Sequence, residues 1–100
     1  MKVIFSTEAK SDLRHIAAYI ARDAPVRALS FVKELRKTSM RIADTPLGFP
    51  LMPHHESSGI RRRPTGNYLI FYVVRDDAIY IVHILNAAVD YEAVLFPRAD

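Results

Sequence analysis

Residues 59–72 constrain the fold of this 100-residue chain more than any other segment. The segment reads GIRRRPTGNYLIFY, in which Arg61, Arg62 and Arg63 run into a Pro/Gly turn that is followed by an apolar, aromatic strand. Gly66 and Asn67 tolerate the positive φ of a tight reversal, so the segment predicts a β-hairpin. The arginines cannot all be buried, because desolvating unpaired charges costs too much free energy. We therefore expect a rigid hairpin that carries cationic groups; the alternative is a basic surface strand that only aids solubility.

Two further strands are expected at about 67–75 and 78–85, after a first strand at 59–63. Both are apolar on both faces. In the strand at 67–75, one face carries Tyr68, Ile70, Tyr72 and Val74, and the other carries Leu69, Phe71 and Val73. In the strand at 78–85, one face carries Ile79, Ile81 and Leu85, and the other carries Tyr80, Val82 and Ile84. Strands buried on both faces are usually central in a sheet. The short N-terminal strand at 2–5 must then pair beside the last strand. Asp76 and Asp77 form a two-residue reversal between the long strands.

Two amphipathic helices are expected between the first strand and the hairpin, at about 7–22 and 24–44. The first places Leu13, Ile16, Ala17 and Ile20 on one face at i, i+3, i+4 and i+7. Asp12 and His15 fall mostly on its polar face. Pro25 suits the first position of the second helix, where its missing N–H costs nothing. The link is so short that the two helices must pack antiparallel.

The remaining segments are a proline-rich loop at 45–58 and a short helix within 89–96. The apolar side chains of the loop are expected to pack against the core; they are Leu47, Phe49 and Leu51. The resulting order, β-α-α-β-β-β-α, is an α+β fold in which a helix hairpin packs on a small, mainly antiparallel sheet, as one domain over 1–100. The other face of the sheet needs cover from the C-terminal helix, the loop or a partner chain, since exposed apolar surface often marks a partner site.

Composition excludes several classes of protein. The chain has no cysteine, which rules out disulfides and thiolate metal sites and fits a cytoplasmic location. No segment approaches the roughly 20 apolar residues of a membrane span, so no membrane association is expected. The net charge of +3 favours anionic partners, either nucleic acid or an acidic protein segment.

The histidines do not predict a metal site, and no cofactor is expected. His54 and His55 are adjacent, so their side chains diverge, and no further ligand stands at a suitable spacing. His83 lies on a core strand, where simple alternation would place it on the same face as Ile79, Ile81 and Leu85. Its simplest interpretation is a hydrogen-bonded strand histidine, although its ordinary pKa near neutrality would also suit a general acid or base.

The chain resembles the ParE-type toxins of the RelE/ParE toxin–antitoxin superfamily. The resemblance covers nearly the whole chain, in order, and lies in five pieces: Val3-Ile4-Phe5-Ser6 with Ala9 and Asp12-Leu13; 16–21 (IAAYIA); Asp23-Ala24-Pro25 with Ala28 and Phe31-Val32; 59–72; and Val82-His83-Ile84-Leu85-Asn86 with Asp90-Tyr91. Each piece alone is a weak signal, but the ordered series is typical of the superfamily.

The resemblance implies a toxin that inhibits DNA gyrase by binding, without covalent chemistry of its own and without sequence-specific DNA binding by this chain alone. It also implies a ParD-like antitoxin whose C-terminal segment folds over the toxin. The residues assigned to the antitoxin are Arg61, Arg62, Arg63, Leu13, Ile20, Phe31 and Leu35. Those assigned to the target are Asp90, Tyr91 and Leu95.

Two alternatives stay open. RelE-type relatives cleave mRNA on the ribosome, which requires an activating base, cations for the phosphorane and a proton donor. A site of that kind would have to use Arg63, Tyr72, His83 and Tyr91. Alanines stand at 87–88 where such relatives keep an arginine, and asparagine stands at 86 where many have histidine, so the nuclease function is disfavoured. The other alternative is a non-toxic co-repressor module.

Overall fold

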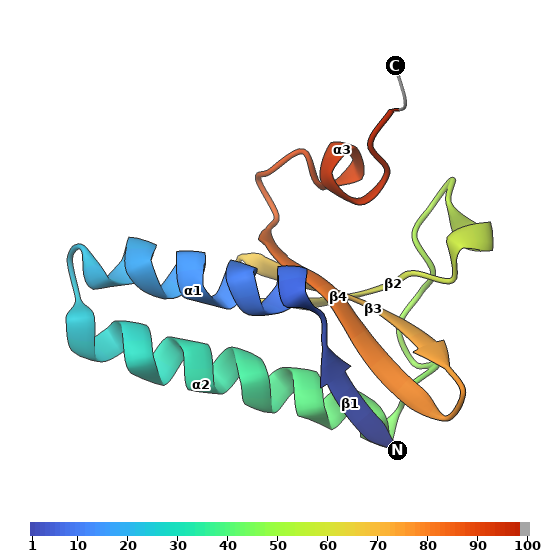
Figure 1. The fold of residues 1–100 in the computed structure, drawn as a ribbon, viewed down its shortest axis with the longest axis horizontal. Helices are drawn as coiled ribbons and strands as arrows, with labels where there is room; N and C mark the ends of the chain where they lie inside the picture. The colour runs from blue at the N-terminus through green and yellow to red at the C-terminus, as the bar shows by residue number, and fades with distance from the viewer. Residues whose placement is uncertain (99–100) are drawn as a thin grey trace.

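The computed structural model describes residues 1–98 (Figure 1). Its elements follow in the order β1 (Lys2–Phe5), α1 (Thr7–Ala21), α2 (Pro25–Arg41), the 3₁₀ turns η1 (Ile42–Asp44) and η2 (Glu56–Ser58), β2 (Arg61–Thr65), β3 (Tyr68–Arg75), β4 (Ala78–Asn86) and α3 (Tyr91–Leu95). The expected order β-α-α-β-β-β-α and the α+β class are confirmed.

The four strands form one sheet in the order β1-β4-β3-β2. β1 lies parallel beside β4, while β2 and β4 both pair antiparallel with β3. The two strands that are apolar on both faces are therefore the central ones, as predicted. Asp76 and Asp77 make the reversal between them, and both have positive φ, at 52° and 60°. In the β2–β3 turn, Gly66 has φ 58°, whereas Asn67 is not among the residues with positive φ.

A bulge in β4 changes the expected alternation of its side chains. Phe71 pairs with His83 and Tyr72 pairs with Ile81, so Val82 has no partner on β3. An extra residue of this kind moves the side chains of the residues that follow to the opposite faces of the sheet. Ile84, 1% exposed, therefore packs with the residues under the helices, and Leu85 packs on the opposite face. The predicted placement of Leu85 with Ile79 and Ile81 was wrong for this reason.

The helix hairpin follows the sequence signals closely. Ser6 caps α1 by accepting a hydrogen bond from the Ala9 N–H at 2.9 Å, and its own hydroxyl donates to the Val82 carbonyl of β4 at 2.8 Å. Pro25 is the first residue of α2. The predicted end of this helix at 44 is corrected, because the last turn tightens into η1 after Arg41. In Figure 1 the hairpin projects well beyond the strands, so its tip has no sheet beneath it.

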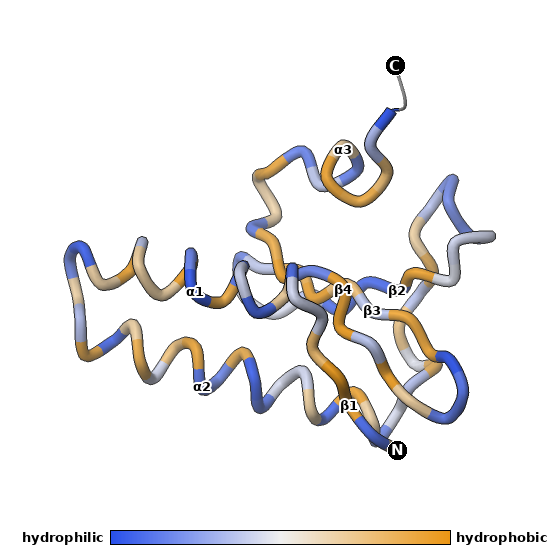
Figure 2. The backbone as a smooth tube through the Cα atoms, viewed as in Figure 1, coloured by the Kyte–Doolittle hydropathy of each residue, from blue (hydrophilic) through white to orange (hydrophobic). Residues whose placement is uncertain are grey.

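Each face of the sheet carries its own hydrophobic cluster. The larger one lies under the hairpin and includes Ile70, Tyr72, Ile79 and Ile81, all fully buried. The smaller one, centred on Phe71, lies against α3 and the loop before β2. The C-terminal helix and the loop thus cover the second face, which were two of the three covers expected. Figure 2 shows hydrophobic residues along the strands and hydrophilic ones at the β3–β4 turn and the hairpin tip.

The loop at 45–58 differs from the expectation in its anchors. Leu47 is 66% exposed and does not plug the core, so that prediction was wrong. Phe49 is partly buried against the larger cluster, and Leu51 is half-buried in an isolated bridge with Arg61. Met52, at 1% exposed, is the loop residue that fills the smaller cluster.

The first hairpin strand runs from Arg61 to Thr65 instead of 59–63. Gly59 adopts φ 75° and ends η2, so it cannot begin the strand. Pro64 is tolerated because β2 is an edge strand, where no ladder donor is needed. Among the described residues, no helix is both long and apolar enough to cross a membrane.

Candidate functional site

The three arginines of β2 divide between the two faces of the sheet. Arg61 and Arg63 pair with Tyr72 and Ile70, which face the helix hairpin. Arg62 pairs with Phe71, on the face covered by α3. They therefore do not form one continuous cationic patch, although they are consecutive in sequence.

Each arginine is engaged within the chain. Arg61 Nη1 donates to the Phe49 carbonyl at 2.7 Å, and the Arg63 guanidinium lies 5.1 Å from the centre of the Phe49 ring while bonding to the Pro64 carbonyl. Arg62 Nη1 donates to the Tyr91 hydroxyl at 3.0 Å. All three are half-buried, so they fix the loop and α3 to the edge strand.

Tyr72 is a core residue. It is fully buried, and its hydroxyl donates to the Pro46 carbonyl at 2.7 Å. Burial raises the pKa of its phenol, and the charge of Arg61 only partly opposes this shift. The side chain holds the loop onto the sheet and is closed to any substrate.

His83 and Asp12 form the most buried ionisable pair in the described part of the chain. His83 Nδ1 lies 2.7 Å from Asp12 Oδ2, and the side chains are 17% and 15% exposed. The same carboxylate oxygen accepts the Ile84 N–H at 2.9 Å. Asp12 thus ties α1 to β4 just beyond the end of β1, where β4 has lost its neighbouring strand. The placement of Asp12 on the polar face of the helix missed this role; its position four residues before Ile16, beside the apolar stripe, was the available signal.

Two hollows flank this pair. One, of about 380 Å³, is lined by Asp12, His15, Ile16, Tyr19 and the ends of β3 and β4; the other, of about 330 Å³, is lined by Thr7, Glu8, Ser11, Asp12, His15 and His83. A carboxylate that orients an imidazole suits proton transfer. However, no lysine or arginine lines either hollow, so the cations that phosphoryl chemistry needs are not supplied there by the described residues.

The residues required for a nuclease do not converge. Arg63 and Tyr72 lie on the hairpin face of the sheet, and Tyr91 lies on the opposite face against Phe71, with ring centres 5.3 Å apart. His83 sits on β4, which β3 separates from β2, and it is engaged with Asp12.

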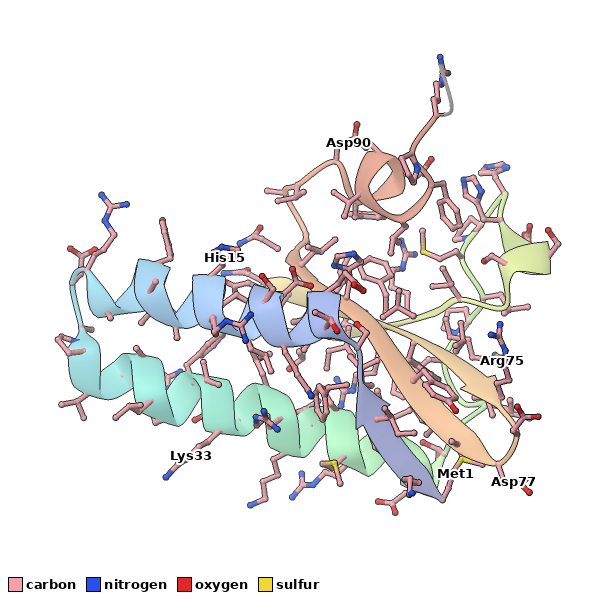
Figure 3. The ribbon with its side chains drawn as sticks, in the orientation of Figure 1. Met1, His15, Lys33, Arg75, Asp77 and Asp90 are labelled. Atoms are coloured by element: carbon pink, nitrogen blue, oxygen red, sulfur yellow. The ribbon has the colours of Figure 1, made fainter. Side chains whose placement is uncertain are left out.

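The residues assigned to the target belong to α3. Asp90 caps this helix by accepting from the Ala93 N–H at 3.4 Å. Tyr91 and Leu95 pack inward against the smaller cluster. Of the three, Asp90 is the one whose side chain lies at the surface (Figure 3).

The apolar residues assigned to the antitoxin are mostly inside the hairpin. Leu13 and Leu35 are 4% and 3% exposed and cannot touch a partner in this structure. Ile20 and Phe31 are half-buried, with the Phe31 ring 5.4 Å from that of Tyr68. The contact between the two helices buries these two leucines, and their assignment to the antitoxin stays a prediction.

The remaining histidines do not build a metal site. His55 Nε2 lies 3.6 Å from Glu92 Oε2, and its ring stacks on Phe96 at 3.9 Å between centres. Within residues 1–98 no group of three possible ligands is arranged to hold a metal ion. His55 helps to hold α3 in place.

A model of the ParE toxin family of type II toxin–antitoxin systems matches residues 3–91. The chain belongs to this family. No individually curated protein matches it.

Solved structures share the fold of this ParE-family chain. The chromosomal ParDE system from P. aeruginosa aligns with a TM-score of 0.73 at 18% identity, over 86% of this chain and 95% of that one. The RelBE2 toxin–antitoxin complex from Mycobacterium tuberculosis aligns with a TM-score of 0.63 at 18% identity, over 85% and 95%. The RelB–RelE complex from Methanococcus jannaschii aligns at 0.53 and 17% identity, over 96% and 99%. At these identities the likeness concerns the fold alone.

Proposed function

We propose that this ParE-family toxin inhibits DNA gyrase by binding and is neutralised by a ParD-like antitoxin. The observation that carries the proposal is the family match over 3–91. The structure supports a binding function in a second way. The polar side chains that could act in catalysis are engaged in contacts within the fold and are divided between the two faces of the sheet.

An antitoxin partner fits the aligned structures, which are toxin–antitoxin complexes or systems. The hairpin also offers apolar side chains to a partner. Tyr19, Val26 and Leu29 are 67%, 85% and 71% exposed near its tip. Burial of such groups stabilises a complex.

The second candidate is a ribosome-dependent endoribonuclease, and the His83–Asp12 pair is the observation that favours it. Without a nearby cation the pair would be a poor catalyst, since one oxyanion stabiliser is typically worth about 10²–10³ in rate. The co-repressor alternative predicts antitoxin binding with no toxicity.

One experiment separates the three functions. The chain is expressed alone and together with a candidate ParD-like antitoxin, and purified toxin is added to gyrase supercoiling and ribosome-bound mRNA assays. We expect inhibited supercoiling that antitoxin reverses, with intact mRNA. Cleaved mRNA that depends on His83, with unaffected gyrase, would establish the nuclease instead. Antitoxin binding without growth arrest would leave the co-repressor.

A further inference from the structure

The end of β4 has a free edge on the side where β1 stops. β1 pairs with Ala78–Ile81, whereas β4 runs on to Asn86 (Figure 1). Ser6, which follows β1, donates to the carbonyls of Ile81 and Val82. Beyond these contacts, no strand within residues 1–98 pairs with β4 on this side.

The pairing with β3 decides which backbone groups point to the free edge. Residues of an antiparallel pair alternate between positions that bond to the neighbouring strand and positions that face away from it. Ala87 donates its N–H to the Asn67 carbonyl at 2.8 Å, so it is turned toward β3. Two residues back, Leu85 is turned the same way, whereas Ile84 and Asn86 face the free edge.

Two neighbouring backbone groups stay open on this edge. The Ile84 N–H donates to Asp12 Oδ2 at 2.9 Å, which agrees with the direction derived from the pairing. The Ile84 carbonyl and the Asn86 N–H follow it along the strand and have no partner among the described residues. A hydrogen-bond acceptor and a donor therefore stand side by side.

The residues that carry these groups line the larger of the two hollows beside α1, of about 380 Å³. Leu85 lines it as well, although its side chain packs on the opposite face of the sheet. Leu85 therefore reaches the hollow through its main chain, which shows that the edge of the strand forms part of the wall. The volume lies at the lower end of the about 300–1,000 Å³ that is usual for small-molecule sites.

Tyrosine side chains from two elements line the same hollow. Tyr68 begins β3 and is half-buried, and Tyr19 lies on α1 and is 67% exposed. Aromatic rings of this kind offer a flat heterocycle a surface on which to stack. Asp12 contributes a carboxylate, and no lysine or arginine among the described residues lines the hollow, so an uncharged ligand is favoured over a phosphorylated one.

We propose that this hollow binds an uncharged nucleoside whose base carries an amino group beside a ring nitrogen, as adenine does. The exocyclic amine donates to the Ile84 carbonyl, and the ring nitrogen accepts from the Asn86 N–H. The base stacks on Tyr68, with Tyr19 at the open side. This binding does not depend on the gyrase or antitoxin interactions proposed above.

An added β-strand suits this edge less well than a base does. A strand needs a run of open donors and acceptors. Here Asp12 already occupies the Ile84 N–H, and β4 ends at Asn86. One acceptor and one donor in a concave, partly aromatic site match the edge of a single base.

The test compares adenosine with inosine by titration calorimetry on the full chain. The two nucleosides have nearly the same shape, but inosine presents an oxygen and an N–H where adenosine has the amine and the bare ring nitrogen. We expect adenosine to bind saturably and inosine to bind at least about tenfold more weakly, because both hydrogen bonds are mismatched. Adenosine should also raise Tm. Adenosine monophosphate should bind no more tightly than adenosine, since no lining cation meets its phosphate.

Asn86→Pro removes the N–H donor, and Asn86→Ala is its matched control because it keeps this N–H. The N–H faces away from β3, so the proline removes no bond between the strands. We expect the proline variant to lose adenosine binding and the alanine variant to keep it within about threefold.

The stacking is tested separately by Tyr68→Ala, with Tyr80→Ala as the control at a half-buried position of β4 that does not line the hollow. The first change should weaken adenosine binding and the second should not. Circular dichroism checks that every variant folds.

Several outcomes overturn the inference. Equal binding of adenosine and inosine would mean that the backbone pair is not read, and this comparison needs no variant. The same holds if the wild type shows no saturable adenosine binding. Binding that survives Asn86→Pro in a folded variant would put the base elsewhere. Binding of an oligoadenylate RNA without binding of adenosine would assign the contact to a nucleic-acid backbone instead.

Discussion

Removing the Asp12 carboxylate should destabilise the protein more than removing any exposed charge from the same helix. Its Oδ2 accepts the Ile84 N–H at 2.9 Å and contacts His83 Nδ1 at 2.7 Å. In Asp12→Ala the Ile84 N–H loses its acceptor beside a side chain that is 1% exposed. A buried unsatisfied group costs about 1–3 kcal/mol, and a hydrogen bond to a charged group contributes about 1.5–3 kcal/mol. Because these terms overlap, we expect a loss of about 2–4 kcal/mol in the free energy of unfolding.

The measurement is urea denaturation followed by circular dichroism, with an unchanged m value showing that the same surface unfolds. In a domain of this size, each kcal/mol shifts Tm by about 4–8 °C. Asp12→Asn keeps an oxygen for the Ile84 N–H and should lose less than Asp12→Ala.

Glu8→Ala is the matched control, since it removes the same charge from the exposed first turn of α1. Its expected cost is only the dipole interaction, about 0.3–1 kcal/mol. If Asp12→Ala were no more destabilising than Glu8→Ala, the carboxylate would not tie α1 to β4. Likewise, a double-mutant cycle with His83→Ala that showed no coupling would refute the contact between the two side chains.

Three further substitutions test the fold. Leu35→Ala, at a position 3% exposed, should cost about 2–5 kcal/mol in denaturation, whereas Leu29→Ala, at one 71% exposed, should cost little; equal losses would contradict the helix packing. Burial raises the pKa of Tyr72, so this phenol ionises at lower pH in the unfolded chain than in the folded one, and the free energy of unfolding falls as pH rises past about 10. Tyr72→Phe should reduce this dependence of stability on alkaline pH, and it also removes the hydrogen bond to the Pro46 carbonyl. Gly66→Ala forces φ 58° on an L-residue and should cost about 1–2 kcal/mol in the same assay; an unchanged denaturation midpoint would contradict the positive φ.

The fold could be predicted because its signals lie within a few residues of one another or in the alternation of apolar side chains along the strands. Capping by Ser6, the proline at the start of α2 and the Asp76-Asp77 reversal are each specified within a few residues. The order of strands followed because two strands with no polar face must be central. The bulge at Val82 could not be read, since it depends on how β4 meets β3 and α1 in space.

The candidate site was harder to predict because side-chain contacts between distant elements decide it. Arg61 to Arg63 stand out in the sequence as a cationic run, yet alternation along β2 sends them to opposite faces. The pairing of Asp12 with His83 joins residues 71 positions apart.

The contrast between engaged and open arginines bears on how a small toxin can be both stable and neutralisable. A half-buried arginine that already donates to a carbonyl gains little from an external carboxylate, because the new contact replaces an old one. An exposed cation beside an unburied apolar stripe gains both an ion pair and apolar contact at once. The residues that look most reactive in the sequence therefore serve the fold. On this argument, charge reversal at Arg62 should act through stability, loosening α3, before it acts on partner affinity.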